Sequence, residues 1–387
     1  MNRFYFDHNA TTPVSGEVLD AMVACLRQTH GNASSIHYYG QAAKQRLEQA
    51  RRELAGVLGC DANEIVLVSG GTEADNLALF GVVRATRRIA HIITTSIEHP
   101  AVLAACRELE REGHAVAYLE PDSNGVVDPE DVRCALRPDT VLVSVMQANN
   151  ETGVVQPIGE IAAIAHEAGA LIHSDGVQAF GKLSGDVRAL GVDLYSISGH
   201  KIYAPKGIGA LYVRNGTVLE PIIRGGHHER DRRAGTENVA SAVALAAAVN
   251  AARRDLDSEA QRLGQLRDRL ENAILGRVPA AGVNGGRAAR VPNTTNIWFD
   301  GVQGEALVIA LDLAGFAVST GSACSSGAVE PSHVLSAMGL STERARASLR
   351  FSLGRSNTVE QVDALAEAVE QSVARLRGVS ARWSACV

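Results

Sequence analysis

Seven short apolar runs constrain the fold of this chain more than any other feature of its sequence. They lie between Ile65 and Val213, and longer amphipathic stretches separate them. The runs read IVLVS, HIITT, AVAYL, TVLVSVM, ALIHSD, LYSIS and IGALYV. Continuous Val, Ile and Leu with helical segments between them are typical of strands covered on both faces. The sequence therefore predicts an α/β domain with a mostly parallel central sheet and helices on both faces.

The pattern changes after Thr236. Residues 238–275 are rich in Ala, then in Arg and Glu, with helical spacing. The rest of the chain predicts a strand at 294–299, a helix at 305–313, a Gly/Ser loop at 319–327, a strand at 348–353 and a helix at 359–377. We expect a large α/β domain over residues 15–255. A smaller α+β domain would comprise residues 1–14 and 256–387.

Charge and hydropathy exclude two classes of partner. The net charge of -6 gives no electrostatic reason to bind nucleic acid or an anionic membrane. No apolar stretch is long enough to cross a bilayer, and no signal peptide is visible. We therefore expect a cytoplasmic protein. Its cysteines, at positions 25, 60, 106, 134, 324 and 386, form no CxxC pair and should be free thiols.

Two glycines follow the first apolar run, in Ser69-Gly-Gly-Thr-Glu, and a helical pattern begins there. Glycines let backbone N–H groups approach an anion, and a helix N-terminus adds partial positive charge. Gly71 and Thr72 are thus candidates to hold a phosphate. An ordinary strand-to-helix turn, with Thr72 as its cap, explains the same residues.

A lysine follows another predicted strand, in Ser198-Gly-His-Lys201. An amine at a strand end could form a Schiff base with an aldehyde cofactor. Ser198 and His200 could donate hydrogen bonds to a phosphate of that cofactor. The alternative for an isolated Lys201 is an exposed surface side chain.

Three further polar groups end predicted strands. Asp175 would suit a protonated pyridine nitrogen, although a helix or turn cap is the alternative. His99 could stack on a cofactor ring and relay protons, or it could be a surface histidine. Asn150 lies in Asn-Asn-Glu-Thr-Gly, which a turn explains equally well.

Cys324 lies in Ser-Thr-Gly-Ser-Ala-Cys-Ser-Ser-Gly, among small polar residues typical of an exposed, mobile loop. Cys25, Cys106 and Cys134 lie in helical apolar patterns, where we expect them to fill the core. Cys324 is therefore the candidate nucleophile. Arg350, inside an apolar strand, needs an anionic partner; an amino-acid carboxylate or a structural ion pair would serve.

Taken in order, these motifs form a pattern found in a known family. The stretches DHNATTP, GNASSIH, SGGTEADN, IEHPAV, ANNETGVVQPI, HSDGVQAFGK, SGHKIYAPKGIGALYVR, RGGHHERDRRAGTENVAS, STGSACSSGAVEPSHV and LRFSLGR run from about residue 4 to the C-terminal helix. The chain resembles the cysteine desulfurases of the NifS/IscS class, most closely the NifS branch. They belong to the class-V aminotransferases, with fold type I of the pyridoxal-phosphate enzymes.

The resemblance implies a role for each matching residue. Lys201 would form the Schiff base, and His99 would stack on the ring. Asn150 and Arg350 would bind the substrate carboxylate. The implied cofactor-binding set is Gly71, Thr72, His99, Asn150, Asp175, Gln178, Ser198, His200, Lys201 and Thr236. In that set, Asp175 pairs with the pyridine nitrogen and Gln178 bonds the phenolic oxygen.

The resemblance also implies an assembly and a reaction. The protein would be a homodimer, with Thr236 reaching the phosphate bound by the other subunit. It would convert L-cysteine to L-alanine and hold the sulfur as a persulfide on Cys324, the third catalytic residue beside Lys201 and His99. The persulfide would pass to an acceptor such as an iron–sulfur scaffold, with a nitrogenase-related role implied by the NifS-like features. Cys324 is also a candidate transient ligand of an iron–sulfur cluster.

Three departures from the family pattern accompany the match. Gly176 stands where Ala is usual against the cofactor ring, so we expect a looser contact there. Thr320 replaces a usual Ser, and His8 a more usual Asn or Tyr. Rival functions are a selenocysteine lyase or an aminotransferase on the same fold, and a sulfur-relay scaffold without catalysis.

Overall fold

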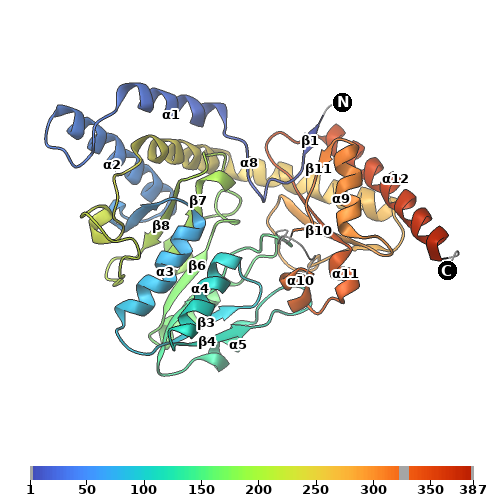
Figure 1. Cartoon of the computed structure of the whole chain (residues 1–387), viewed down its shortest axis with the longest axis horizontal. Helices are drawn as coiled ribbons and strands as arrows, with labels where there is room; N and C mark the ends of the chain where they lie inside the picture. The colour runs from blue at the N-terminus through green and yellow to red at the C-terminus, as the bar shows by residue number, and fades with distance from the viewer. Residues whose placement is uncertain (1–2, 322–330, 385–387) are drawn as a thin grey trace.

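A seven-stranded sheet forms the centre of the larger part of the molecule (Figure 1). The structure is a computed structural model that describes residues 3–321 and 331–384. The strand order is β2-β8-β7-β6-β5-β3-β4, and only β8 runs antiparallel to its neighbours. The strands are β2 (Ile65–Val68), β3 (His91–Thr95), β4 (Ala115–Leu119), β5 (Thr140–Ser144), β6 (Leu171–Asp175), β7 (Leu194–Ser198) and β8 (Gly209–Val213).

Helices cover both faces of this sheet because its strands bury both sets of alternating side chains. Ile65 and Leu67 join the core shared with α1, α2, α6 and α8. Val66 and Val68 join the opposite core, shared with α3 and α4. The helices of this part are α1 (Gly16–Gln28), α2 (Tyr38–Leu58), α3 (Gly71–Ala85), α4 (Pro100–Arg111), α5 (Pro129–Ala135), α6 (Ile158–Glu167), α7 (Val187–Leu190) and α8 (Val239–Arg277).

A smaller antiparallel sheet, in the order β12-β10-β9, forms the second part. Its own core unites Phe299, Phe351 and Val369. Near it, the N-terminal strand β1 pairs in parallel with β11. The elements here are β1 (Phe4–Tyr5), β9 (Ala281–Val283), β10 (Thr294–Phe299), β11 (Phe316–Ala317), β12 (Ser348–Ser352), α9 (Gly304–Leu313), α10 (His333–Ala337), α11 (Thr342–Arg346) and α12 (Val359–Ser384).

The long helix α8 connects the two parts, as Figure 1 shows. Its residues up to Val249 belong to the core of the large sheet. From Leu263 onward they belong to the core of the small sheet. The change of core therefore falls within one continuous helix, and the domain bounds given above stay a prediction.

The predicted fold class is confirmed, and each of the seven apolar runs contains a strand. The expected strand at 294–299 matches β10, and the helices near 305–313 and from 359 match α9 and α12. The two-residue strands β1 and β11 are too short to give a pattern. Within the described ranges, no helix has both the length and the apolarity needed to cross a membrane.

Candidate active site

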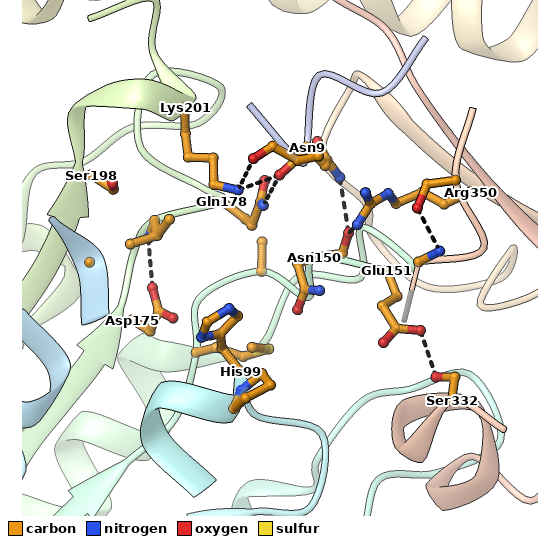
Figure 2. A pocket seen from close by; sticks show the side chains of 18 of the residues that line it. Asn9, His99, Asn150, Glu151, Asp175, Gln178, Ser198, Lys201, Ser332 and Arg350 are labelled. Atoms are coloured by element: carbon orange, nitrogen blue, oxygen red, sulfur yellow. Dashed lines mark hydrogen bonds between the residues drawn. The ribbon is translucent and has the colours of Figure 1, made fainter. Parts of the chain in front are cut away.

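A cavity of about 530 Å³ lies at the carboxyl ends of the parallel strands. In Figure 2 its wall passes from the large sheet, through the N-terminal segment at Asn9, to the small part of the molecule at Arg350. Most of the site residues predicted from the sequence line it. They are Gly71, Thr72, His99, Asn150, Asp175, Gln178, Ser198, His200, Lys201 and Arg350.

The N-terminus of α3 forms one end of this cavity. The first helical hydrogen bond runs from Ala74 N to Gly70 O, so the helix leaves the amides before Ala74 without an intrahelical acceptor. A Cβ at Gly71 would approach Val177 Cγ2 to 2.8 Å, so only glycine fits without a shift there. Glu73 accepts from Ser69 N at 2.8 Å and closes the turn. This end is built to receive an anion.

Lys201 ends a 3₁₀ turn that directly follows β7. Its Nζ donates to the carbonyl oxygens of Asn9 and, at 2.9 Å, of Ala10. Burial and the nearby Arg350 lower the pKa of Lys201 to about 8, against the opposing pull of Asp175. An amine with this pKa is half neutral at about pH 8, so a reactive neutral fraction is present near physiological pH, which suits a nucleophile.

His200 and Ser198 lie on the same turn. The Nδ1 of His200 lies 3.1 Å from Thr11 Oγ1. Burial lowers the pKa of His200 to about 4, so this imidazole is neutral at physiological pH. The buried Ser198 and the neutral His200 both line the cavity near α3 and can donate hydrogen bonds to an anion.

Asp175 is the last residue of β6 and is buried. Its Oδ1 accepts from Val177 N at 2.8 Å, which fixes the carboxyl group (Figure 2). Burial raises the pKa of Asp175, and His99 and Lys201 oppose that rise. A cation placed beside this carboxyl would stabilise its charged form.

His99 caps the N-terminus of α4. Its Nδ1 accepts from Ala101 N at 3.1 Å, which leaves Nε2 to carry the proton of the neutral ring. Burial lowers the pKa of His99, and the charge of Asp175 opposes this. The structure thus places a neutral imidazole with one defined donor in the cavity.

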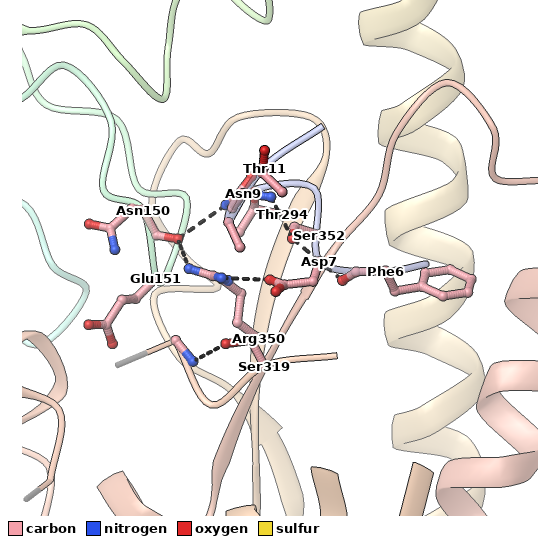
Figure 3. A network of polar contacts seen from close by, with 12 residues as sticks. Phe6, Asp7, Asn9, Thr11, Asn150, Glu151, Thr294, Ser319, Arg350 and Ser352 are labelled. Atoms are coloured by element: carbon pink, nitrogen blue, oxygen red, sulfur yellow. Dashed lines mark hydrogen bonds and ion pairs between the residues drawn. The ribbon is translucent and has the colours of Figure 1, made fainter. Parts of the chain in front are cut away.

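Arg350 lies in β12 at the opposite end of the cavity, and Figure 3 shows its contacts. Its guanidinium lies 2.7 Å from Asp7 Oδ1 and donates to the carbonyl oxygen of Asn150 at 3.0 Å. The anionic partner that the sequence demanded is present within the chain itself. A ligand carboxylate at this position would share Arg350 with Asp7 or displace it.

Sequence reasoning missed Asn9, around which the cavity wall is organised. Its carbonyl oxygen accepts from Lys201 and, at 3.0 Å, from Gln178 Nε2. Its side chain donates to Asn150 O at 3.1 Å and to Thr294 Oγ1 at 2.9 Å. Its place in the DHNATTP stretch was the available signal, but the stretch gives no hint of which strands it meets.

Three buried carboxyl groups beside the site were also missed. Asp75 lines the cavity, and burial raises its pKa well above the usual value. Burial likewise raises the pKa of Glu98 to about 8 and that of Glu151. Glu151 Oε2 accepts from Ser332 Oγ at 2.6 Å. A carboxyl group inside an apolar helical face, as at Asp75, is the signal that could have found the first.

Among the predicted site residues that the structure describes, one is not brought to the cavity. Thr236 is exposed and does not line it. Cys324 lies outside the described residues, although Gly321 and Pro331, which border the omitted segment, both line the cavity. Cys25 and Cys106 are buried as expected. The expectation for Cys134 was wrong: it is exposed near the end of the short helix α5.

The three residues that depart from the family pattern, Gly176, Thr320 and His8, lie in different surroundings. A Cβ at Gly176 would lie 1.9 Å from Tyr195 Cζ, so the Tyr195 ring fills the room of the missing methyl. A looser contact with a bound ring stays a prediction. Thr320 lines the cavity. His8 is buried against Gly354, and burial lowers its pKa to about 4.

Comparison with known proteins agrees with this geometry. The aminotransferase class-V family matches residues 4–365. A cysteine desulfurase of Gluconacetobacter diazotrophicus is 46% identical over 385 residues, covering 99% of this chain and 96% of that protein. The cysteine desulfurase IscS of Dictyoglomus turgidum is 45% identical, covering 97% of this chain and 96% of that one.

Solved structures show the same likeness in three dimensions. A NifS-like protein superposes with a TM-score of 0.90 at 37% identity, covering 96% of this chain and all of that one (100%). SspA in complex with cysteine gives a TM-score of 0.81 at 36% identity, covering 90% of this chain and 98% of that one. The chain therefore belongs to the class-V aminotransferases and, within them, to the cysteine desulfurase family.

Proposed function

We propose that this protein is a pyridoxal-phosphate-dependent cysteine desulfurase. It takes sulfur from L-cysteine, releases L-alanine and passes the sulfur to an acceptor protein. One observation carries the proposal: Lys201, with a lowered pKa, and Arg350 lie at opposite sides of one cavity. A nucleophilic amine facing a carboxylate-binding guanidinium suits an amino-acid substrate held on an aldehyde cofactor.

The residues present fit this cofactor. The amides at the start of α3, with Ser198 and His200, suit its phosphate. Lys201 suits its aldehyde, and the buried carboxyl of Asp175 suits the protonated pyridine nitrogen. When bound, pyridoxal phosphate supplies an aldehyde that captures amines and a ring that accepts an electron pair from carbon.

Lys201 and His99 supply the proton transfers. A fraction of Lys201 carries a neutral amine near physiological pH, and this form can remove the α-proton of the substrate. His99 donates from Nε2, since Nδ1 is occupied by Ala101 N. Asp175 keeps its charge when a cation lies beside it, so its negative charge holds the pyridine nitrogen protonated. Arg350 and the side chain of Asn150 orient the substrate carboxylate.

Cys324 would receive the sulfur. Its thiolate attacks the sulfur of the substrate, the bond from that sulfur to Cβ breaks, and Cβ gains a proton to become the methyl group of alanine. The proton lost by the Cys324 thiol accounts for the extra hydrogen of the alanine methyl group, and the substrate's own S–H hydrogen stays on the persulfide. The step therefore balances without an added oxidant or reductant. The persulfide then passes to a second thiol, on an iron–sulfur scaffold or another acceptor.

A spectrum and a product assay test the function together. The purified protein should be yellow, and borohydride should fix the cofactor on Lys201. Cys324→Ser should keep the colour but lose alanine and sulfide production by roughly three orders of magnitude. Near wild-type sulfide release by Cys324→Ser would indicate a lyase of the selenocysteine type. A colourless wild type would favour the relay scaffold.

We also propose that the enzyme works as a homodimer. Thr236 is exposed and outside its own cavity, which suits a residue that serves a neighbour. Exposed apolar side chains on α1 and at the start of α2 offer an interface: Leu26 is 58% exposed, Ile36 93% and Tyr38 81%.

Mixed dimers test the role of Thr236. One chain carries Thr236→Ala and the other Lys201→Ala. If Thr236 serves the neighbour, both lesions fall on one site and the other site stays active. If Thr236 serves its own chain, both sites are damaged and activity is lost.

A further inference from the structure

A second lysine lies behind the cavity, where the proposed reaction assigns it no role. Lys182 is partly buried, one turn of chain after Gln178, and its amino group lies against two buried side chains. Its Nζ donates to Gln178 Oε1 at 2.8 Å and to Asn9 Oδ1 at 3.1 Å. Lys182 and Lys201 also border the same small cavity of about 40 Å³.

Both acceptors of Lys182 are neutral amide oxygens. Among the residues that the structure describes, no carboxylate pairs with its amine. Burial, together with the charges of Lys201 and Arg350, lowers the pKa of Lys182 well below its usual value. Two of its N–H groups point to these two amide oxygens. This lysine therefore acts here as a hydrogen-bond donor and not as an ion-pair partner.

The contacts of Lys182 determine how the Gln178 amide is oriented. Because Oε1 accepts from Lys182, Nε2 must be the end that faces the cavity side. Nε2 has two hydrogens, and one goes to Asn9 O at 3.0 Å (Figure 2). The second remains for a ligand. Asn9 is itself held by Lys182 and by Asn293 Nδ2, at 3.1 Å each.

We propose that Lys182 is a positioning residue, which holds Gln178 and Asn9 so that the second Nε2 hydrogen points at the phenolic oxygen of the bound cofactor. The inference rests on the proposed function, in which Gln178 bonds that oxygen. A donor at the phenolic oxygen stabilises its negative charge, and the neighbouring nitrogen joined to Lys201 then loses its proton more easily.

The test is the pH at which the visible absorbance of the resting holoenzyme changes, measured without substrate. Lys182→Met removes both donors and should raise this midpoint by about half a pH unit or more. Gln178→Met should raise it at least as much. The double variant should match Gln178→Met alone, because Lys182 acts through Gln178. Lys182→Gln, which keeps two N–H groups, should stay near the wild-type midpoint.

Controls separate this inference from the proposed function. Lys206→Met, at an exposed lysine, should leave the midpoint unchanged. If the wild-type protein shows no pH-dependent absorbance change, the proposed function is wrong. If the wild type shows the change but Lys182→Met has the same midpoint, only the role of Lys182 is wrong. Additive shifts in the double variant would also overturn it. If Lys182→Met does not fold, Lys182→Gln decides: a shift as large as that of Gln178→Met would overturn the proposal.

Discussion

At the end of the cavity formed by α3, β6 and β7, unsatisfied helix amides and the side chains of Asp175 and Lys201 face the open volume. At the end formed by β12, the guanidinium of Arg350 is already paired with Asp7. The first end would hold a cofactor that stays bound through many turnovers. Under the proposed function, the second would take up and release a substrate carboxylate each time.

This difference affects how tightly each end of the cavity would hold its ligand and how readily it would release it. A preformed anion site loses little free energy to reorganisation, so it holds its ligand tightly. A guanidinium with an internal carboxylate partner binds a second carboxylate more weakly, because part of the gain is offset by the lost ion pair. We infer that Asp7 limits how tightly Arg350 can retain substrate or product. Four predictions test this contrast, from the largest expected effect to the smallest.

Removal of the Lys201 amine, at the end of the cavity that would hold the cofactor, should have the largest effect. Lys201→Ala should lower alanine formation by about a thousandfold or more, because it deletes both the nucleophile and the base. The bound cofactor should then be released by mild dialysis. Lys206→Ala is the matched control and should keep wild-type kcat. A normal kcat in Lys201→Ala would mean that another amine does the chemistry.

A milder change at the end of the cavity formed by β12, where Arg350 would bind the substrate carboxylate, should affect substrate binding alone. Arg350→Lys keeps the charge beside Asp7 but loses the planar two-point contact. KM for cysteine should rise roughly 100-fold, while the cofactor absorbance and its retention stay as in the wild type. Steady-state kinetics measure the KM for cysteine, and a separate cofactor titration measures how tightly the cofactor is bound. Loss of cofactor in this variant would show that the two ends are not independent.

The lowered pKa of Lys201 predicts how the apoprotein takes up its cofactor. Burial lowers this pKa to about 8, so the reactive neutral amine increases as pH rises through that value. Uptake of pyridoxal phosphate should therefore speed up about tenfold between pH 7 and pH 9 and then level off. Stopped-flow absorbance measures it. A rate independent of pH over this range would contradict the assigned pKa.

The smallest effect is expected from Asp7→Asn. This change removes the carboxylate that competes for Arg350, so KM for cysteine should fall by about two- to fivefold, equivalent to about 0.4–1 kcal/mol. It should also move the midpoint of cofactor uptake to lower pH, because Asp7 helps to keep the pKa of Lys201 up. Asp20→Asn, on the surface of α1, is the control. A rise in KM would instead make Asp7 a residue that positions Arg350.

The sequence predicted which residues line the cavity end near α3, β6 and β7 better than it predicted the contacts at the end formed by β12. Lys201, Asp175 and Ser198 lie directly at the ends of parallel strands, and parallel strands bring their carboxyl ends to one edge of a sheet. Local pattern and one topological rule were enough. Whether Thr236 and Cys324 take the parts expected of them stays a prediction.

The carboxylate end required contacts that no local pattern encodes. Asp7 and Arg350 are 343 residues apart in the chain, and the two-residue strand β1 that carries the first toward the second gives no periodic signal. Lys182 was missed for a related reason, because Asn9, one of its two acceptors, lies 173 residues away in the chain. Cys134 was misjudged because the short helix α5 turns it outward.

The contact from Asn9 N to Ser352 Oγ has a consequence for biosynthesis. The two residues are separated by 343 positions, and they meet at 2.9 Å beside the lysine. A ribosome adds about 5–20 residues per second, so Asn9 waits roughly 17–70 seconds for its partner to be made. The large sheet can form meanwhile, but the wall around Lys201 stays open on the nascent chain. Maturation of the site is therefore a late event, which follows translation of β12.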